Sequence, residues 1–450
     1  MSVEMQGAEF GDERLSRRLG VLADLMAERP DAGFPEALDD AELEAAYRFF
    51  GNDRVTPEAI LAPHFRQTAR RAAEHERVLV VHDTTQFEFG GQKQREGLGR
   101  LIRPGQGFFG HFSLAITADG KREPLGLLGL ETVFRLDKPT PKAERGKGNR
   151  GESARWRQGI AGAEGLLAGG ATAIHVMDRE ADSNAILLAL VGHGSFVIRS
   201  SQNRVLAGDE HDHLRAVARS ARPTLEREVP LSPRPHSSGP KGKRHPARRY
   251  RLAQLSIAAA SVELHRSKDQ VASESSTMPV NVVHVCEQNS PRGEPAVEWF
   301  LLTNLPVATA EAIAFVVDCY RARWTIEEYF KALKTGCQYE RRQLESAGSL
   351  LNALAILAPV AWRLLLLRHL ARATPDEPAE VALTSTQLTV LRALGRKPLP
   401  KHPTVRDAML AVAALGGHLK SNGDPGWLVL GRGMHDLLLL ELGWRARGEK

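Results

Sequence analysis

Residues 320–336 read YRARWTIEEYFKALKTG, and four of them form the spaced pattern Y-x2-R-x3-E-x6-K. The four are Tyr320, Arg323, Glu327 and Lys334. At about 100° of rotation per residue, a helix over residues 308–334 would place them within roughly 60° of one another. One stripe of that helix would then carry a phenol, a guanidinium, a carboxylate and an ammonium. A carboxylate flanked by cations suits a site that holds a metal ion together with a phosphodiester.

The same stripe has a second interpretation as a solvated helix face. Glu327 is spaced i, i+4 from both Arg323 and Lys331, so it can form ordinary ion pairs across the helix surface. Taken by itself, the helix fits this interpretation more readily than a catalytic one. The choice between the two therefore depends on the rest of the chain.

The composition is that of a globular protein. The chain has 450 residues, of which 42% are hydrophobic and 25% are charged, which is enough for about two to four domains. Cys286, Cys319 and Cys337 are odd in number and lack a C-x-x-C spacing, which argues against a disulfide framework or a zinc site. The N-terminus has no apolar signal segment, and the most apolar run, residues 350–367, is interrupted by a proline and an arginine. We therefore expect a soluble, cytoplasmic protein.

The formal charge of +6 is unevenly distributed along the chain. Residues 1–75 hold nine Arg or Lys against fifteen Asp or Glu, a net charge of −6, so the remainder carries +12. Two Gly/Pro-containing stretches are basic: residues 138–150, and residues 234–251 with seven Lys or Arg and no acid. Both stretches are typical of loops that bind phosphates, and equally typical of charged loops that only keep the protein soluble.

Patterning along the chain predicts an α/β core between helical ends. Apolar runs bounded by Gly and Pro predict strands at 77–89, 110–120, 125–136, 172–177 and 196–199, with a helix at 153–170. Thr56 and Pro57 fit the N-cap and first position of another helix. The expected divisions are a helical domain, a first core segment, a β-rich insertion, a second core segment and a helical C-terminal region, at 1–75, 76–200, 201–297, 298–372 and 373–450.

Two aspartates are each the first carboxylate after an apolar run that is predicted to form a strand. Asp83 follows the apolar run VLVVH, and Asp178 follows AIHVM. If these strands are neighbours, their carboxylates meet at one edge of the sheet, and a helix bearing Glu327 can close the triangle. Such hard oxygen ligands suit Mg²⁺ or Mn²⁺ rather than zinc. Each aspartate alone also fits a turn residue or a helix cap at a strand end.

Three motifs together carry a specific resemblance: HDTT at 82–85, DREAD at 178–182, and YRARWTIEEYFKALKTG. They resemble the DDE transposases of bacterial insertion sequences, in the branch with a Y-R-E-K motif on the last catalytic helix. The resemblance covers nearly the whole chain, from GDERLSRRL near the N-terminus to LGGHLKSNGDPGW near the C-terminus. It implies a ribonuclease-H-like core with a β-rich insertion, between an N-terminal domain that recognises inverted repeats and a C-terminal domain for dimerisation and DNA contact.

The resemblance implies that Asp83, Asp178 and Glu327 form a catalytic triad that binds metal. The gap of 149 residues from Asp178 to Glu327 matches the branch in which a β-rich insertion separates the last two acids. Each site would hold two Mg²⁺ ions, for which Mn²⁺ could substitute.

Five further residues acquire DNA-binding roles through the same resemblance. Tyr320, Arg323 and Lys334 would contact phosphates near the cleaved transposon end, and Arg199 would contact DNA as well. Trp299 would stack on a base flipped out of the duplex while a hairpin forms. A buried strand tryptophan is the alternative for Trp299, because two apolar residues follow it.

The implied reaction is cut-and-paste transposition. A metal-activated water would nick one strand at the element end, and the freed 3′-hydroxyl would attack the opposite strand to give a hairpin. A second water would open the hairpin before strand transfer into target DNA. The partners would be double-stranded DNA and a second protomer, in a bacterial cytoplasm and on the nucleoid when bound to DNA. The alternatives are a DNA-binding inhibitor, an inactive relic, or a nuclease with the ribonuclease H fold.

The acidic N-terminal region needs a local basic patch to bind DNA. Two arginine clusters on helical faces could supply it, namely Arg14, Arg17 and Arg18, or Arg66, Arg70 and Arg71. At the other end of the chain, residues 437–440 with Trp444 fit either a pairing surface between protomers or ordinary core.

Overall fold

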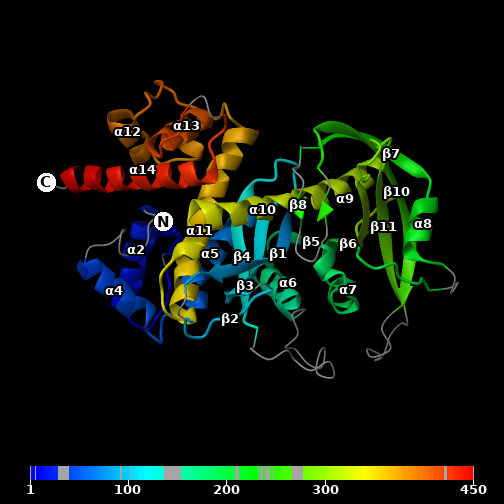
Figure 1. The fold of residues 1–450 in the computed structure, drawn as a ribbon, viewed down its shortest axis with the longest axis horizontal. Helices are drawn as coiled ribbons and strands as arrows, with labels where there is room; N and C mark the ends of the chain where they lie inside the picture. Colours follow the sequence, from blue (N-terminus) through cyan, green and yellow to red (C-terminus); the bar gives the residue numbers. More distant parts are fainter. Residues whose placement is uncertain are drawn as a thin grey trace. The chain divides into compact units, whose positions relative to one another are not determined.

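The computed structural model describes most of the chain: residues 2–5, 7–28, 40–91, 94–102, 104–135, 154–207, 212–231, 233, 237–238, 244–245, 247–265, 277–419 and 423–448. The chain forms two compact units. Unit 1 comprises Met1–Thr172 and Trp324–Lys450, and unit 2 comprises Ala173–Arg323. Figure 1 shows the helices and strands of both.

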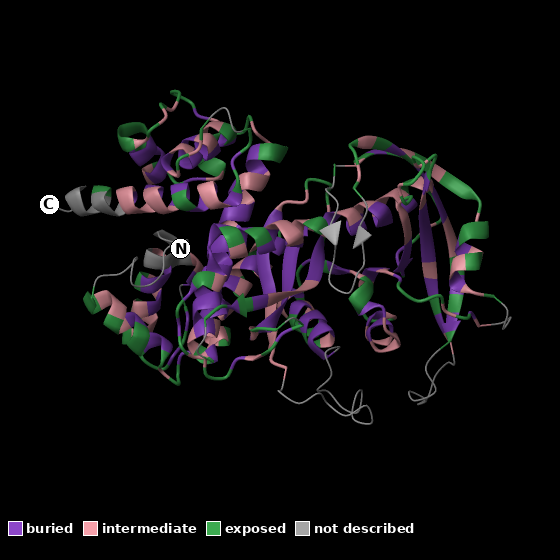
Figure 2. Cartoon of the chain, in the orientation of Figure 1, coloured by how far each residue is buried: buried purple, intermediate pink, exposed green. Residues whose placement is uncertain are grey.

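Unit 1 contains an antiparallel sheet whose strands confirm three of the predicted runs. Strand β3 (Gln106–Thr117) pairs with β1 (Arg77–Phe89) on one side, and with β4 (Pro124–Val133) and the short β2 (Gly99–Arg100) on the other. All of β3 after Gln106 is buried, as Figure 2 shows for this sheet. Gly107 is required here, because a Cβ at that position would lie 1.9 Å from the carbonyl oxygen of Phe87.

The helices of unit 1 gather around one long apolar helix, α11 (Ala347–Ala373). Length and composition alone would allow α11 to cross a membrane, but 83% of its most apolar stretch is buried inside the protein, which makes it a core helix. Around it and the sheet lie α1 (Ser2–Met5), α2 (Glu13–Glu28), α4 (Asp40–Phe50), α5 (Pro57–Ala72), α6 (Ala154–Leu167), α10 (Trp324–Lys331), α12 (Ser385–Leu394), α13 (Val405–Leu415) and α14 (Trp427–Gly448). The predicted cap of α5 is confirmed, since Thr56 Oγ1 accepts the Ala59 N–H at 3.2 Å.

Unit 2 contains a mixed sheet with the strand order β5-β6-β12-β11-β10-β7. Strands β5 (Thr172–Met177) and β6 (Ser195–Arg199) are parallel, and the others are antiparallel: β12 (Glu298–Thr303), β11 (Thr277–Gln288), β10 (Arg251–His265) and β7 (Pro223–Leu231). Helix α8 (Leu214–Ser220) lies against β10 and β11. Unit 2 also contains α7 (Asn184–Leu190), α9 (Ala310–Ala322), the 3₁₀ turn η1 (Arg179–Ala181) and a small hairpin of β8 (Ser237–Ser238) and β9 (Arg244–His245).

The β-rich insertion is continuous with the rest of the sheet in unit 2. Strand β12 lies between β6 and the inserted strand β11, so the insertion completes the hydrogen bonding of β12. Both neighbours are antiparallel to β12, with Val285 opposite Trp299 and Arg199 opposite Leu301.

The single helix predicted over residues 308–334 is wrong. Helix α9 ends at Ala322, Arg323 is a turn residue, and α10 ends at Lys331. A π-helical turn, η4 (Ala332–Gly336), follows, in which the Cys337 N–H bonds the carbonyl of Ala332 at 2.8 Å. Close packing accompanies the wider turn, because a Cβ on Gly431 of α14 would lie 2.4 Å from the Gly336 carbonyl oxygen. The regular helical period therefore does not reach Lys334.

The two basic stretches fall mainly outside the described residues. This applies to all of 138–150 and to much of 234–251. Arg251, the last residue of the second stretch, is described and does not behave as a phosphate-gripping residue. Its guanidinium bonds Glu287, with an Nε–Oε1 distance of 2.7 Å, and also pairs with Glu294. Its positive charge is therefore matched within the protein.

Candidate active site

Unit 1 brings together the strand and the helix that carry two of the predicted carboxylates. Asp83 on β1 is the cross-strand partner of Phe112 on β3, so both side chains lie on the same face of the sheet. The Phe112 ring contacts Tyr329 and Phe330 of α10, with centroid distances of 5.5 and 5.6 Å. Helix α10 therefore packs on the face that bears Asp83, and it carries Glu327. Both carboxylates are half-buried.

The opposite face of β1 holds a buried polar cluster that the sequence did not reveal. Thr84 Oγ1 lies 2.9 Å from His111 Nδ1 and accepts a hydrogen bond from Arg155 Nε at 3.1 Å. The His111 ring packs edge-on against Trp156, with centroids 4.5 Å apart. Burial, with a smaller contribution from Arg155, lowers the pKa of His111 to about 3. A neutral imidazole thus holds the side chain of Thr84, the residue that follows Asp83 in the HDTT motif.

Lys334 lies in the same unit and is held by internal partners. Its Nζ donates to the carbonyl of Gln86 on β1 and lies 3.6 Å from Glu340 Oε1. The ammonium also sits 5.2 Å from the ring centroid of Phe87. Burial lowers the pKa of Lys334, while neighbouring carboxylates, Glu340 foremost and Glu327 among them, oppose that shift. The π turn thus places the Lys334 ammonium at β1, within electrostatic range of Glu327.

In unit 2, Asp178 directly follows β5 and is half-buried. Its Oδ1 accepts the Glu180 N–H at 2.8 Å, so Asp178 does cap the turn η1, as the simpler interpretation predicted. Strands β5 and β6 are parallel with Met177 opposite Ile198. Asp178 and Arg199 therefore lie at the same, C-terminal ends of these two strands. A strand-end cap and a ligand at the sheet edge are compatible roles for one carboxylate.

Three predicted DNA-binding residues cluster in unit 2. The rings of Trp299 and Tyr320 meet edge-on at 5.3 Å, and the Arg199 guanidinium lies 6.0 Å from the Trp299 ring centroid. Arg199 Nη2 also donates to the carbonyl of Glu298 at 3.3 Å. Trp299 is half-buried, whereas Tyr320 is only 7% exposed. Arg323, the fourth predicted DNA-binding residue in unit 2, is half-buried and directly follows α9.

The predicted site residues therefore divide between the two units. Unit 1 contains Asp83, Glu327 and Lys334, and unit 2 contains Asp178, Arg199, Trp299, Tyr320 and Arg323. Within each unit they are grouped, and the meeting of the three carboxylates at one point stays a prediction.

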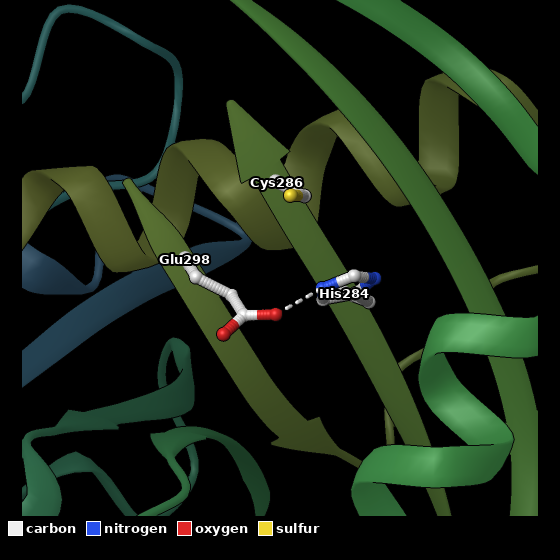
Figure 3. A group of neighbouring side chains, drawn as sticks. All are labelled: His284, Cys286 and Glu298. Carbon is white, nitrogen blue, oxygen red and sulfur yellow. Dashed lines mark hydrogen bonds and ion pairs between the residues drawn. The ribbon is translucent and has the colours of Figure 1, made fainter. Parts of the chain in front are cut away.

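A second polar group, which was not identified from the sequence, lies on the neighbouring strands β11 and β12 of unit 2 (Figure 3). His284, Cys286 and Glu298 place possible metal-ligand atoms within 4.8 Å of one another, and His284 Nε2 lies 3.1 Å from Glu298 Oε1. However, Arg219 of α8 donates to both oxygens of Glu298 at 3.0 Å. Hydrogen bonding to Arg219 accordingly lowers the pKa of Glu298, with a further contribution from His284. The carboxylate already has a cation, so this network joins α8 to β12.

Arg71, a member of the second arginine cluster, is engaged by partners inside unit 1. Its Nε donates to the Leu125 carbonyl at 2.6 Å, its Nη1 lies 2.9 Å from Glu4 Oε1, and its guanidinium stacks on Trp362 at 4.4 Å. Burial acts to raise the pKa of Glu4, but hydrogen bonds from His64 and Arg71 lower it to about 2. Arg71 therefore ties α1 to α5 and the core of unit 1.

Other arginines of the N-terminal region remain accessible. Arg14, Arg17 and Arg70 are exposed, Arg18 is half-buried, and Arg66 is exposed although it donates to the Gly7 carbonyl at 2.8 Å. In the C-terminal helix, Leu437 is fully buried core, whereas Trp444 is 40% exposed.

Comparison with known proteins identifies two segments. Residues 1–55 match the family described as transposase DNA-binding, and residues 133–361, just over half of the chain, match the family described as transposase DDE domain. The second match includes Asp178 and Glu327, while Asp83 precedes it. A solved structure, the cryo-EM structure of the piggyBac transposase synaptic complex with hairpin DNA, shows 11% identity and a TM-score of 0.35 over 80% of this chain and 67% of that one. A likeness this distant supports no conclusion about this chain.

Proposed function

The chain belongs to the transposase DDE domain family and is a DNA transposase, and we propose that it excises an insertion sequence at its terminal inverted repeats and joins it to target DNA. The observation that carries the proposal is the placement of Asp83 and Glu327 on facing elements of unit 1. Asp178 is the third member, at the sheet edge where Arg199 also emerges. The Y-R-E-K branch and a ribonuclease-H-like core belong to this proposal, with the antiparallel β1-β3-β4 sheet and the parallel β5–β6 pair as support.

Transposases of the DDE type use divalent metal, and the donor set fits such an ion. The proposed ligands Asp83, Asp178 and Glu327 are all carboxylates, the donors that Mg²⁺ and Mn²⁺ prefer. All three are half-buried, so they are accessible from solvent. Two bound ions would supply activation of the attacking hydroxyl and stabilisation of the leaving oxygen.

The remaining proposed residues hold DNA in place for the reaction. In this proposal Arg199, Arg323 and the largely buried Tyr320 would donate to backbone phosphates, and Lys334 would add a positive charge within electrostatic range of Glu327. To contact a phosphate, the Lys334 ammonium would exchange its bonds to Gln86 and Glu340 for bonds to the DNA. In the proposed sequence, water nicks one strand, the freed 3′-hydroxyl forms a hairpin, and hairpin opening precedes joining. Two protomers would pair the two ends.

A cleavage assay tests this function. The protein is incubated with duplexes that end in the inverted repeats flanking its own coding region, with Mg²⁺ or with EDTA, and the products are separated on denaturing gels. We expect nicks and hairpins with Mg²⁺ only. A DNA-binding inhibitor or relic would bind the ends without cutting them, and a general nuclease would cut unrelated duplexes equally well without forming hairpins. Either result would refute the proposal.

Trp299→Ala is expected to reduce hairpin formation while the first nick persists. Stacking of one base on an aromatic ring contributes about 1–3 kcal/mol, so the loss should be roughly 5- to 150-fold. Trp299→Phe serves as the matched variant, because it keeps a ring that can stack on the base and meet Tyr320 edge-on. Single-turnover kinetics of nick and hairpin give the measurement. If nicking and hairpin formation fall equally in Trp299→Ala, the side chain is structural and flips no base.

A further inference from the structure

Asp182, the last residue of the DREAD motif, is a fully buried carboxylate whose Oδ2 accepts several hydrogen bonds and whose Oδ1 forms an ion pair with Arg204. Its side chain is 0% exposed, and its Oδ1 lies 2.6 Å from Arg204 Nη1. Its Oδ2 accepts the Ser201 N–H at 2.6 Å, the Gln202 N–H at 3.0 Å and the Ser200 hydroxyl at 3.1 Å. A buried charge is tolerated only when it is paired and hydrogen-bonded in this way.

The same residue also holds the chain through its backbone. The Asp182 carbonyl accepts Gln202 Nε2 at 2.7 Å and Arg204 Nη2 at 3.3 Å. Asp182 is the C-cap of the turn η1, and Asp178 is its N-cap. One residue therefore connects the end of the turn after β5 to the segment that follows β6.

The location of this connection matters because of the strand register. With Met177 opposite Ile198, Asp178 and Arg199 are each the next residue along parallel neighbours. Asp182 accepts a hydrogen bond from Ser200, the residue directly after Arg199. The Ser200 N–H in turn donates to the carbonyl of Phe300, the residue after Trp299. A three-residue 3₁₀ turn has poorer hydrogen-bond geometry than an α-helix, so by itself it holds Asp178 weakly. The Asp182 carboxylate supplies the missing constraint.

We propose that Asp182 is a positioning residue that holds the Asp178 carboxylate and the Arg199 guanidinium in fixed relation. This inference rests on the proposed function, in which Asp178 binds a divalent metal and Arg199 contacts DNA. Residues that orient metal ligands typically change metal affinity by 10- to 100-fold when replaced. Asp182 acts through Asp178 and does not itself touch the metal.

The test compares Mn²⁺ binding and cleavage in wild type and Asp182→Asn. The amide keeps the size of the side chain but removes the charge and replaces one acceptor oxygen with a donor. Titration calorimetry of the protein alone should show an Mn²⁺ Kd raised about 10-fold, and the Mg²⁺ concentration for half-maximal cleavage should rise similarly. Asp212→Asn, which alters an exposed carboxylate of unit 2, is the matched control and should leave both values unchanged.

The outcomes separate this inference from the function on which it rests. Wild type that neither binds Mn²⁺ nor cleaves would overturn both. Wild type that binds and cleaves, together with an Asp182→Asn protein of unchanged Mn²⁺ affinity, would overturn the positioning role alone. A lower melting temperature with an unchanged metal midpoint would have the same meaning. If Asp182→Asn does not fold, Ser200→Ala removes one donor, keeps the charge and should give a smaller shift in the same direction.

Discussion

Replacing Glu327 with glutamine is expected to lower the rate of transposon-end cleavage about a thousandfold or more. The substitution keeps the size of the side chain but removes the charge that the proposed metal site requires. The loss of one essential electrostatic group commonly lowers the reaction rate about 10²–10³-fold or more. End binding, measured by gel shift without metal, should persist because the DNA-contacting residues are intact. Single-turnover cleavage with Mg²⁺ provides the measurement.

Glu328 offers a matched control for this prediction. It is the adjacent residue on α10, and it forms ion pairs with Lys331 at 2.6 Å and with Arg368 at 3.5 Å. Glu328→Gln therefore removes the same charge from the same helix at a position with internal partners. We expect it to retain most of the cleavage activity. Equal activity of the two variants would show that Glu327 is not a metal ligand.

The second large effect concerns stability: Glu4→Gln is expected to destabilise unit 1 by about 3 kcal/mol at pH 7. The pKa of Glu4 is lowered from 4.5 to about 2, and each pKa unit corresponds to about 1.4 kcal/mol. A depressed carboxyl pKa stabilises the fold above the unfolded-state value, and this contribution is lost as the pH falls toward 2. The difference between wild type and Glu4→Gln should therefore shrink to less than half at about pH 3.

Urea unfolding at pH 7, 4.5 and 3 measures this difference. Glu9→Gln is the control, because Glu9 is an exposed carboxylate close by in the sequence. A Glu4→Gln deficit that stays constant between pH 7 and pH 3 would mean that the ion pair with Arg71 and the bond to His64 contribute through packing rather than charge.

Local patterns predicted the strands well and the long helix poorly. Strands β1, β3, β4, β5 and β6 appear where apolar runs between Gly and Pro predicted them. The interruption of the helix after Lys331 is accompanied by a close approach of Gly336 to Gly431, almost a hundred residues later. No local signal near Lys334 records that contact, so a regular helical period was the natural expectation.

The charged residues show the same limit. Arg70 and Arg71 are neighbours of the same type, yet one is exposed and the other is engaged by Glu4 and Trp362. Sequence patterning placed Asp178 directly after a strand, because that depends on local chemistry, whereas Asp83 lies within β1 and not at its end. Patterning could not identify Asp182 as the hydrogen-bond partner of Ser200, because the pairing of β5 with β6 brings these two residues together.

The position of β12 between β6 and β11 has a consequence for how this fold can change. Removing the insertion would leave one side of the apolar strand Glu298–Thr303 without its ladder of hydrogen bonds. An uncovered apolar strand edge recruits other chains and promotes aggregation. A shortened version of this protein would therefore need a new cover for that edge, such as a helix, a proline or a charged residue on the outer strand. The insertion thus covers β12 and moves the outer edge of this sheet to β7.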